Sequence, residues 1–253
     1  MKKIGLALGG GAVLGAAHIG VLRVLEEMEV EISFITGTSI GAFVGALYAF
    51  GNTSKDIEEI AMELNWMDIS GIAIFENGLL SNAKLGKLLG KSLGKKKIQD
   101  ADIPLAIIAT DIESGEKVVL DKGPVSQAVM ASTGIPGIFS PVEFDKKLLV
   151  DGGIVENIPI DTVKKMGADY IIGVDLNAQQ TYNKPDSILD VIINSFHFTL
   201  KAAAKYQTEN ADLLITPDLS KYNMVSTDQI KDLIEQGYKD AKEQLERADL
   251  PMR

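Results

Sequence analysis

The pentapeptide Gly37-Thr38-Ser39-Ile40-Gly41 carries residue types that could do covalent chemistry. It follows residues 32–36, an apolar run typical of a strand, and precedes residues 42–50, whose apolar spacing is helical. Strand, Gly-x-Ser-x-Gly and helix is the order of a nucleophile elbow. The helix N-terminus behind Ser39 favours the negative charge that an ester carbonyl acquires under attack. The sequence therefore predicts that Ser39 is a nucleophile towards acyl groups.

A second glycine cluster, residues 9–11, lies between a first predicted strand and a first predicted helix. Its backbone N–H groups could bind a phosphate or form an oxyanion hole. A dinucleotide site fits poorly, because Leu14 stands where the third glycine belongs and no acidic residue ends the second strand. The serine on the next strand favours the oxyanion hole.

A serine nucleophile needs a base, and the two histidines of the chain are unpromising. His18 and His197 both lie on apolar faces of predicted helices, which favours a packing role. The order Ser39, Asp151, His197 is that of an α/β-hydrolase triad, but only one strand and one helix precede Ser39. Asp151 ends an apolar run, so we predict a Ser39–Asp151 dyad in which the aspartate accepts the serine proton. Aspartate is a weak base unless burial raises its pKa.

At this point the chain resembles the patatin-like phospholipases, in particular the small single-domain bacterial kind. The shared motifs are the glycine-rich loop at 9–15, Gly-x-Ser-x-Gly at 37–41, Ala-Ser-x-x-Ile-Pro…Phe-x-Pro within 131–142, and Asp-Gly-Gly…Asn-x-Pro within 151–159. The likeness extends from Ile4 to about Gln244. It implies a three-layer α/β/α fold with a mostly parallel central sheet, and one domain over residues 1–253.

The resemblance also implies roles for particular residues. Ser39 would be the nucleophile and Asp151 its only protein partner. Gly10 and Gly11 would line the oxyanion hole, and the elbow geometry suggests the Ile40 N–H as a further donor. The remaining elbow and motif glycines are Gly9, Gly15, Gly37, Gly41, Gly152 and Gly153.

By the same resemblance, the protein would release fatty acid from ester lipids through an acyl-enzyme, without cofactor or metal. The family usually has Arg or Lys where this chain has Leu14. Losing that cation weakens the case for a phospholipid headgroup and favours a neutral ester or a lysophospholipid. Two alternatives stay open. One is an acyltransferase of the malonyl-CoA transacylase type, which needs a histidine base. The other is a non-catalytic nucleotide or lipid binder that uses the glycine loops.

The composition agrees with an enzyme domain of 253 residues. A formal net charge of −10 argues against non-specific binding to nucleic acid or anionic lipid, and the lack of cysteine excludes disulfides and zinc–thiolate sites. With no signal-peptide pattern and no uninterrupted apolar span, we expect a cytoplasmic location. A transient contact with a membrane interface and the oligomeric state stay open.

Strand-like and helical patterns alternate along the chain, which predicts a mostly parallel sheet with its sites at the carboxyl ends of the strands. The expected strands are 4–8, 32–36, 104–110, 117–120, 148–150, 170–174 and 212–216. The expected helices are 12–29, 40–50, 54–64, 84–93, 124–132, 159–166, 187–209 and 227–247. Residues 66–83 hold the single tryptophan and favour a packed connection over the core, and a lid beside Ser39 stays open as the alternative. Asp111 and Glu113 predict a turn with exposed acids rather than a metal site.

Overall fold

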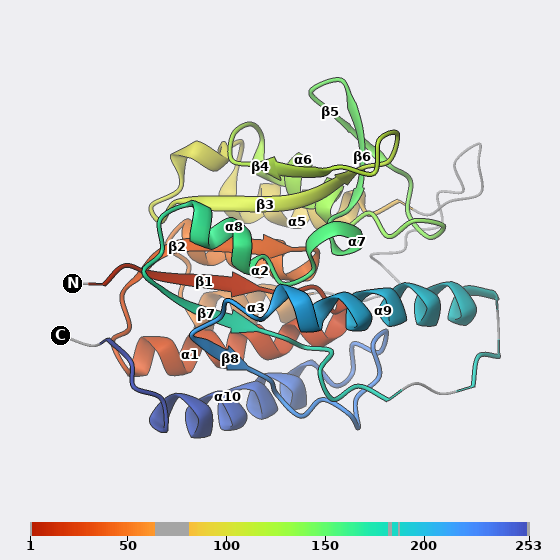
Figure 1. Cartoon of the computed structure of the whole chain (residues 1–253). Helices are drawn as coiled ribbons and strands as arrows, with labels where there is room; N and C mark the ends of the chain where they lie inside the picture. Colours follow the sequence, from red (N-terminus) through yellow and green to blue (C-terminus); the bar gives the residue numbers. More distant parts are fainter. Residues whose placement is uncertain (1, 64–80, 182–183, 187, 252–253) are drawn as a thin grey trace.

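A computed structural model describes residues 2–63, 81–181, 184–186 and 188–251. Its strands form one sheet in the order β5-β6-β3-β2-β1-β7-β8, with β4 paired to β3 (Figure 1). The strands are β1 (Ile4–Leu8), β2 (Ile32–Thr38), β3 (Leu105–Asp111), β4 (Lys117–Leu120), β5 (Val142–Phe144), β6 (Lys147–Asp151), β7 (Tyr170–Val174) and β8 (Leu213–Ile215).

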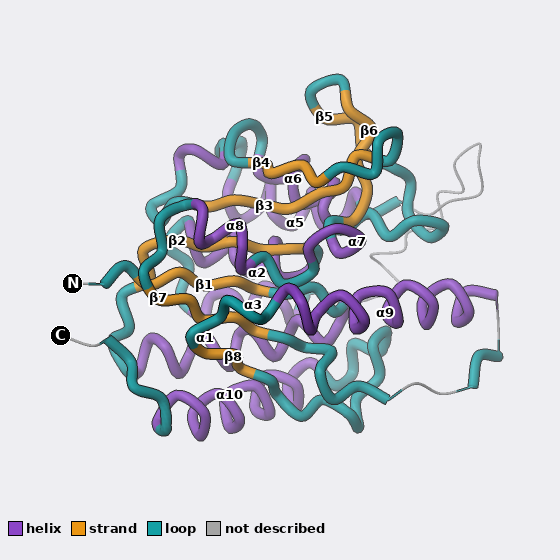
Figure 2. Tube along the Cα trace, in the orientation of Figure 1, coloured by secondary structure: helices purple, strands orange, loops and turns teal. Residues whose placement is uncertain are grey.

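The centre of the sheet is parallel and one end is antiparallel. Strands β3, β2, β1, β7 and β8 run in the same direction. Strands β4 and β6 are antiparallel to β3, and β5 and β6 form a hairpin at the end of the sheet (Figure 2). Every residue of β1, β3 and β7 is buried, as expected for strands covered on both faces.

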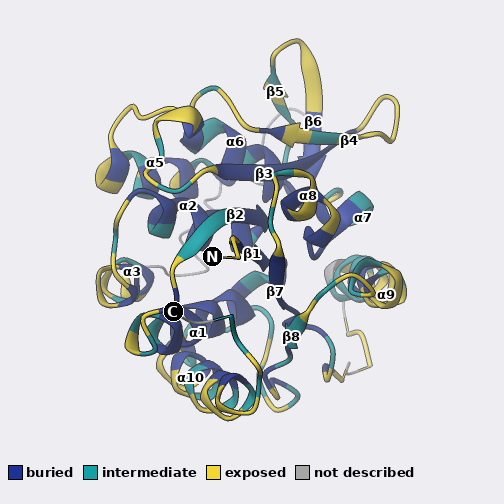
Figure 3. Cartoon of the chain, turned by 60° about the vertical axis from the view of Figure 1, so that its left-hand side comes forward, coloured by how far each residue is buried: buried dark blue, intermediate teal, exposed yellow. Residues whose placement is uncertain are grey.

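Helices cover both faces of the sheet, so the expected three-layer arrangement is confirmed (Figure 3). One face carries α1, α2, α3, α5, α6 and α10, and the other carries α7, α8 and α9. The helices are α1 (Ala16–Glu27), α2 (Ile40–Ala49), α3 (Ser54–Met62), α5 (Ala83–Leu93), α6 (Val125–Ser132), α7 (Gly153–Glu156), α8 (Ile160–Lys165), α9 (Ile188–Gln207) and α10 (Ile230–Glu246). Short 3₁₀ turns, η1 (Ala12–Gly15) and η2 (Ile98–Asp100), precede α1 and β3.

Helix α1 follows the glycine loop and is held by close packing against α10. A Cβ atom added to Gly20 would lie 2.1 Å from the Ile234 carbonyl oxygen, and one added to Gly237 would lie 2.2 Å from the Ala17 carbonyl oxygen. Both distances are shorter than any ordinary contact. The two helices therefore touch backbone to backbone, which only glycine allows at these two positions.

Most of the expected elements are present, and the differences are local. Strand β5 and helix α7 were not predicted, because three or four residues are too few to show a period. Asp151 lies at the carboxyl end of its strand, as expected, but β6 runs antiparallel to β3 and not parallel like the strands at the centre of the sheet. Of the expected connection at 66–83, residues 66–80 lie outside the described part. Within the described residues, no helix is both long enough and apolar enough to cross a membrane.

Candidate active site

Ser39 lies at the turn between β2 and α2, with a backbone φ of 54° and ψ of −125°. This conformation is uncommon for a residue with a Cβ atom and is typical of a strained nucleophile elbow. A Cβ atom on Gly37 would lie 2.6 Å from Ala42 Cα, and one on Gly41 would lie 2.2 Å from the Leu8 carbonyl oxygen. The two predicted glycines are therefore what lets α2 begin directly against β1 and β2.

Hydrogen bonds of Ser132 connect the elbow to β3. The sequence analysis did not identify this role of Ser132. The Ser39 N–H donates to Ser132 Oγ at 2.8 Å, and the Ser132 hydroxyl donates to the Ile108 carbonyl at 2.5 Å. All three groups are buried. Ser132 stands in the Ala-Ser-x-x-Ile-Pro segment of the sequence, so the motif marked its position without indicating its role.

The register of the sheet brings Asp151 towards Ser39. Thr38 at the end of β2 is the partner of Ile108 on β3, and Asp151 at the end of β6 is the partner of Ala109, the next residue along β3. The end of β2, which Ser39 directly follows, and Asp151 at the end of β6 are thus paired with neighbouring residues of β3 from its two sides.

Asp151 is almost completely buried, with 1% of its surface exposed. Its Oδ1 accepts the Gly153 N–H at 2.8 Å, whereas its Oδ2 is buried and accepts no regular hydrogen bond from the described residues. Burial raises the pKa of Asp151 to about 7, against the lowering effects of the Gly153 N–H and the Ser39 hydroxyl. The Ser39 hydroxyl is therefore close enough to Asp151 to lower its pKa, although the two groups do not form a hydrogen bond of regular geometry. Oδ2 is the carboxyl oxygen available to take a proton.

The glycine loop lies against the same site. A Cβ atom on Gly10 would be 3.1 Å from Ser39 Cβ and 2.7 Å from Asn157 Oδ1. The Gly10 N–H itself donates to Asn157, at 3.3 Å to the main-chain oxygen and 3.2 Å to Oδ1. In contrast, the N–H groups of Gly11 and Ile40 donate no hydrogen bond within the described ranges. Of the three donors expected from the sequence, Gly11 and Ile40 are available to an oxyanion in this structure and Gly10 is engaged.

Both histidines are buried, as expected, but His18 has a specific partner. Its Nε2 bonds to the Gly9 carbonyl at 2.8 Å, and Nε2 carries the hydrogen because a carbonyl oxygen only accepts. His197 on α9 packs edge-to-face with Phe196, their ring centroids 6.0 Å apart. Burial lowers the pKa of each histidine to about 4, so both rings are neutral at pH 7. The pKa of Asp151 is set by burial, Gly153 and Ser39, without a histidine.

An apolar pocket opens beside Ser39, with a volume of about 730 Å³ including the part open to solvent. Its polar lining residues are Ser39, Thr133 and Thr227, and apolar side chains from α1, α2, α3 and α5 form most of the wall. The apolar lining consists of Ala12, Val13, Gly15, Ala16, Ile19, Ile40, Phe43, Val44, Ile57, Ala61, Leu85, Ile135, Phe139 and Ile230. Leu14 is absent from this lining and is fully buried in the main core.

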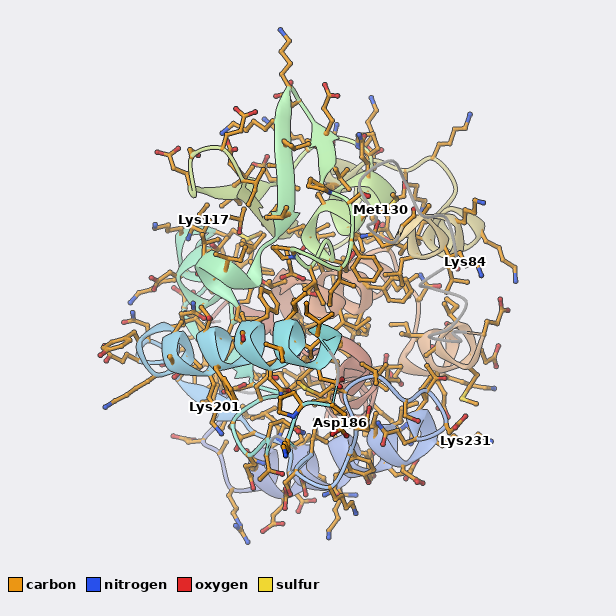
Figure 4. The ribbon with its side chains drawn as sticks, turned by 90° about the vertical axis from the view of Figure 1, so that its right-hand side faces the viewer. Lys84, Lys117, Met130, Asp186, Lys201 and Lys231 are labelled. Atoms are coloured by element: carbon orange, nitrogen blue, oxygen red, sulfur yellow. The ribbon has the colours of Figure 1, made fainter. Side chains whose placement is uncertain are left out.

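Figure 4 views the molecule from the side on which the parallel strands end, with α9 running across this side. Lys201 on α9 donates to the Gln180 carbonyl at 3.1 Å, which ties the helix to the loop after β7. Farther along the same side, the buried carboxylate of Glu156 pairs with Lys117 Nζ at 2.8 Å. These contacts connect α9 to the loop after β7 and α7 to β4.

The acidic turn after β3 is a local structure. Asp111 Oδ1 accepts the Glu113 N–H at 3.1 Å, and Asp111 Oδ2 lies 3.5 Å from Lys147 Nζ. The turn was expected with exposed acids, but Asp111 is buried because it caps the turn from within, and only Glu113 is exposed. No group of three or more potential metal ligands occurs in the ranges that the structure describes.

Comparison with solved structures supports the fold. VipD from Legionella pneumophila superposes with a TM-score of 0.58 and 14% sequence identity, covering 97% of this chain and 67% of VipD. The effector protein ExoU from Pseudomonas aeruginosa gives a TM-score of 0.50 and 15% identity, covering 97% of this chain and 53% of ExoU. At such identities the likeness concerns the fold alone.

Sequence comparison identifies closer relatives. An uncharacterized NTE family protein of Mycobacterium tuberculosis is 35% identical over 184 residues, which are 70% of this chain and 50% of that protein. A lysophospholipase of Pyricularia oryzae is 31% identical over 185 residues, 70% of this chain and 12% of that protein. The human patatin-like phospholipase domain-containing protein 6 is 33% identical over 189 residues, 70% and 14% of the two chains. The chain thus spans half or less of the length of these relatives. The family model for patatin-like phospholipase matches residues 6–164, more than half of the chain, and the protein therefore belongs to the patatin-like phospholipase family.

Proposed function

We propose that this protein hydrolyses carboxylic esters of lipids with Ser39 and Asp151 as a catalytic dyad. The observation that carries the proposal is that the Ser39 hydroxyl neighbours the carboxyl group of Asp151, whose Oδ2 is buried and free of regular hydrogen bonds to described residues. The raised pKa of Asp151 strengthens it as a base. Family membership supports the same reaction class.

In the first half of the reaction, Asp151 takes the Ser39 proton while Ser39 Oγ bonds to the ester carbonyl carbon. The carbonyl oxygen becomes negatively charged and accepts hydrogen bonds from the Gly11 and Ile40 N–H groups. The Gly10 N–H is a third donor only if it exchanges Asn157 for the substrate oxygen. The tetrahedral intermediate then expels the alcohol, which takes the proton from Asp151 and leaves an acyl group on Ser39.

In the second half, water replaces the alcohol. Asp151 takes a proton from the water as its oxygen bonds to the acyl carbon, and the same N–H groups hold the new oxyanion. Collapse releases the fatty acid, and Ser39 recovers its proton from Asp151. The dyad returns to its starting state without a histidine.

The apolar pocket supports a substrate with an acyl chain. Burying a chain against this lining gains about 0.8 kcal/mol for each CH₂ group removed from water. The lysophospholipase name of the fungal relative favours an ester lipid such as a lysophospholipid as the physiological substrate. The coverage of 97% of the chain by the VipD superposition supports treating residues 1–253 as one acyl-hydrolase domain.

The test is hydrolysis of p-nitrophenyl esters of graded chain length by wild type, Ser39→Ala, Asp151→Asn and His197→Ala. We expect the first two variants to lose turnover and His197→Ala to keep it. Activity that survives Ser39→Ala would refute the mechanism, and loss of activity in His197→Ala alongside acyl transfer to a thiol would favour the acyltransferase alternative. A folded wild type that is inert towards these esters and towards phospholipid micelles would instead indicate a binding protein.

A further inference from the structure

The main chain of the glycine loop is held by three side chains, two of which come from distant parts of the sequence. The Gly9 carbonyl accepts from His18, and the Gly10 N–H donates to Asn157. The Gly10 carbonyl accepts from Asn177 Nδ2 at 2.7 Å, in a buried hydrogen bond. Asn177 lies three residues after β7, and none of the sequence motifs includes it. The only sequence signal for Asn177 is its position after the buried strand β7, at the edge of the sheet where the glycine loop and Ser39 also lie.

The contact of Asn177 has a consequence for the next residue, because a peptide unit is planar. The Gly10 carbonyl and the Gly11 N–H belong to one trans peptide unit and point in opposite directions. Asn177 holds the carbonyl on one side, so the Gly11 N–H is directed to the other. That N–H donates no hydrogen bond to any residue in the described part of the chain, and the loop packs directly against Ser39.

The second oxyanion donor is fixed in a different way. The Ser39 carbonyl accepts from the N–H groups of Ala42 at 2.9 Å and Phe43 at 3.3 Å, inside the first turn of α2. The Ile40 N–H belongs to the same peptide unit as that carbonyl and therefore points out of the helix. The Gly10–Gly11 peptide unit has no helix to orient it, and glycine residues on both sides allow it to rotate. A side chain must supply the constraint that α2 supplies for Ile40.

We propose that Asn177 is a positioning residue that orients the Gly10–Gly11 peptide unit so that the Gly11 N–H faces the oxyanion. The inference rests on the proposed ester hydrolysis. Asn177 is itself well anchored: it is 1% exposed, and its backbone N–H donates to Asp175 Oδ1 at 2.8 Å. The Gly10 carbonyl oxygen is an acceptor, so the Asn177 amide must contact it through its nitrogen, which is the donor of this side chain.

The experiment compares a p-nitrophenyl ester with the matching thionoester, in which sulfur replaces the carbonyl oxygen. Sulfur is a weak hydrogen-bond acceptor, so the thionoester gains little from the Gly11 N–H in any variant. Asn177→Leu keeps the side-chain volume and removes the donor, and Asn177→Ala removes both. We expect each to lower kcat/KM for the oxygen ester by about 10²- to 10³-fold, the effect of losing one oxyanion donor, and to lower it much less for the thionoester. The rate ratio of ester to thionoester should therefore fall.

Asn82→Leu is the matched control. Asn82 is also buried, with 2% exposed, and its Nδ2 also donates to a main-chain carbonyl, that of Met130 at 2.7 Å. It should lose stability while keeping the wild-type rate ratio. If both folded Asn177 variants keep the wild-type ratio, whether or not they lose activity, the inference is overturned on its own. If wild type turns over neither ester, the proposed function fails and this inference fails with it.

Discussion

In the proposed mechanism Asp151 acts as a base, although an aspartate is ordinarily too acidic to hold a serine proton. Burial opposes the ionised form and raises the pKa of this carboxyl group to about 7. The single hydrogen bond from Gly153 offsets burial only in part, and it occupies the oxygen that does not accept the proton. The same burial lowers the pKa of the two histidines to about 4 and keeps them out of acid–base chemistry at pH 7.

The pKa of Asp151 predicts how activity depends on pH. Only the ionised carboxylate can accept the Ser39 proton, so kcat/KM should rise about tenfold per pH unit below pH 7 and level off above it. The measurement is kcat/KM for a soluble ester between pH 5 and pH 9. A profile that is already level at pH 5 would show that Asp151 keeps an ordinary pKa. Asp151→Asn should lose about 10²- to 10⁴-fold in rate, and whatever activity remains should not follow this profile.

At the scale of elements, the contact between α1 and α10 helps to position the glycine loop of the site. Helix α1 begins where the glycine loop ends, and its His18 holds the Gly9 carbonyl. The position of α1 therefore sets the position of the loop. Because Gly20 and Gly237 let the two helices meet at the backbone, these glycines act on the site without touching it.

We expect Gly20→Ala and Gly237→Ala to destabilise the protein by about 1–3 kcal/mol or more, since the added methyl groups meet backbone atoms that cannot move aside. Gly90→Ala in α5 is the control, because its added methyl group would meet nothing within 4 Å. That change should stabilise the protein by up to about 1 kcal/mol, since alanine favours a helix over glycine. The measurement is urea unfolding of the three variants and wild type. Equal stabilities for the three variants would contradict the close helix contact.

The pocket between α1, α2, α3 and α5 predicts a preference for acyl-chain length. Ala61 on α3 is a small residue of the lining, so Ala61→Leu should fill part of the space. Hydrolysis of esters with long chains should fall by about tenfold or more, since two lost CH₂ contacts already amount to about 1.6 kcal/mol. Esters with two or four acyl carbons should be hydrolysed as by wild type.

Glu59→Leu is the control, because it also introduces leucine into α3 but on the exposed side of the helix. It should leave the chain-length profile unchanged. A profile that Ala61→Leu also leaves unchanged would place the acyl chain elsewhere.

At the scale of the whole molecule, the sequence predicted the elements that show a repeating apolar pattern. It did not predict the features that depend on tertiary contacts. Strands 4–8, 117–120 and 170–174 were predicted with their observed bounds, because buried apolar runs bounded by turn residues are a strong signal. The hairpin of β5 and β6 was missed in part because three residues carry no period. Direction within a sheet is a tertiary property, and so the antiparallel course of β6 could not be predicted.

The candidate site shows the same division. Ser39, Asp151 and the glycines are marked by short motifs. The shared edge of parallel strands accounts for the placement of Ser39 and the glycine loop but not for that of Asp151, because β6 runs antiparallel to β3. Ser132 and Asn177 contact the site through hydrogen bonds to main-chain groups of Ser39 and Gly10, which are 93 and 167 residues away in the sequence. No spacing rule connects such residues. The engagement of the Gly10 N–H by Asn157 is likewise visible only in the folded chain.

The buried carboxyl of Asp151 also affects the stability of the whole chain. Its pKa of about 7 in the folded protein is above the ordinary value of 3.8 in the unfolded chain, so between these values the folded state binds more protons. Ionising Asp151 therefore costs stability, and the cost grows as pH rises from about 4 to about 7. The two histidines act in the opposite sense, because their pKa of about 4 lies below the ordinary 6.5 and stability is lost as they are protonated on acidification.

A comparison of Asp151→Asn with wild type isolates the contribution of this carboxyl, since the histidines are common to both. The stability of the variant relative to wild type should increase from pH 4 to pH 7.5 by an amount on the order of 4 kcal/mol, and then stay constant. Urea unfolding at several pH values measures this difference. Ser39→Ala keeps the buried carboxyl and removes only a group that lowers its pKa, so it should follow the pH dependence of wild type or exceed it. If the curves of Asp151→Asn and wild type run parallel, the folded protein carries an ordinary carboxylate at this position. If they diverge as expected, the protein gives up part of its stability to hold a base beside Ser39.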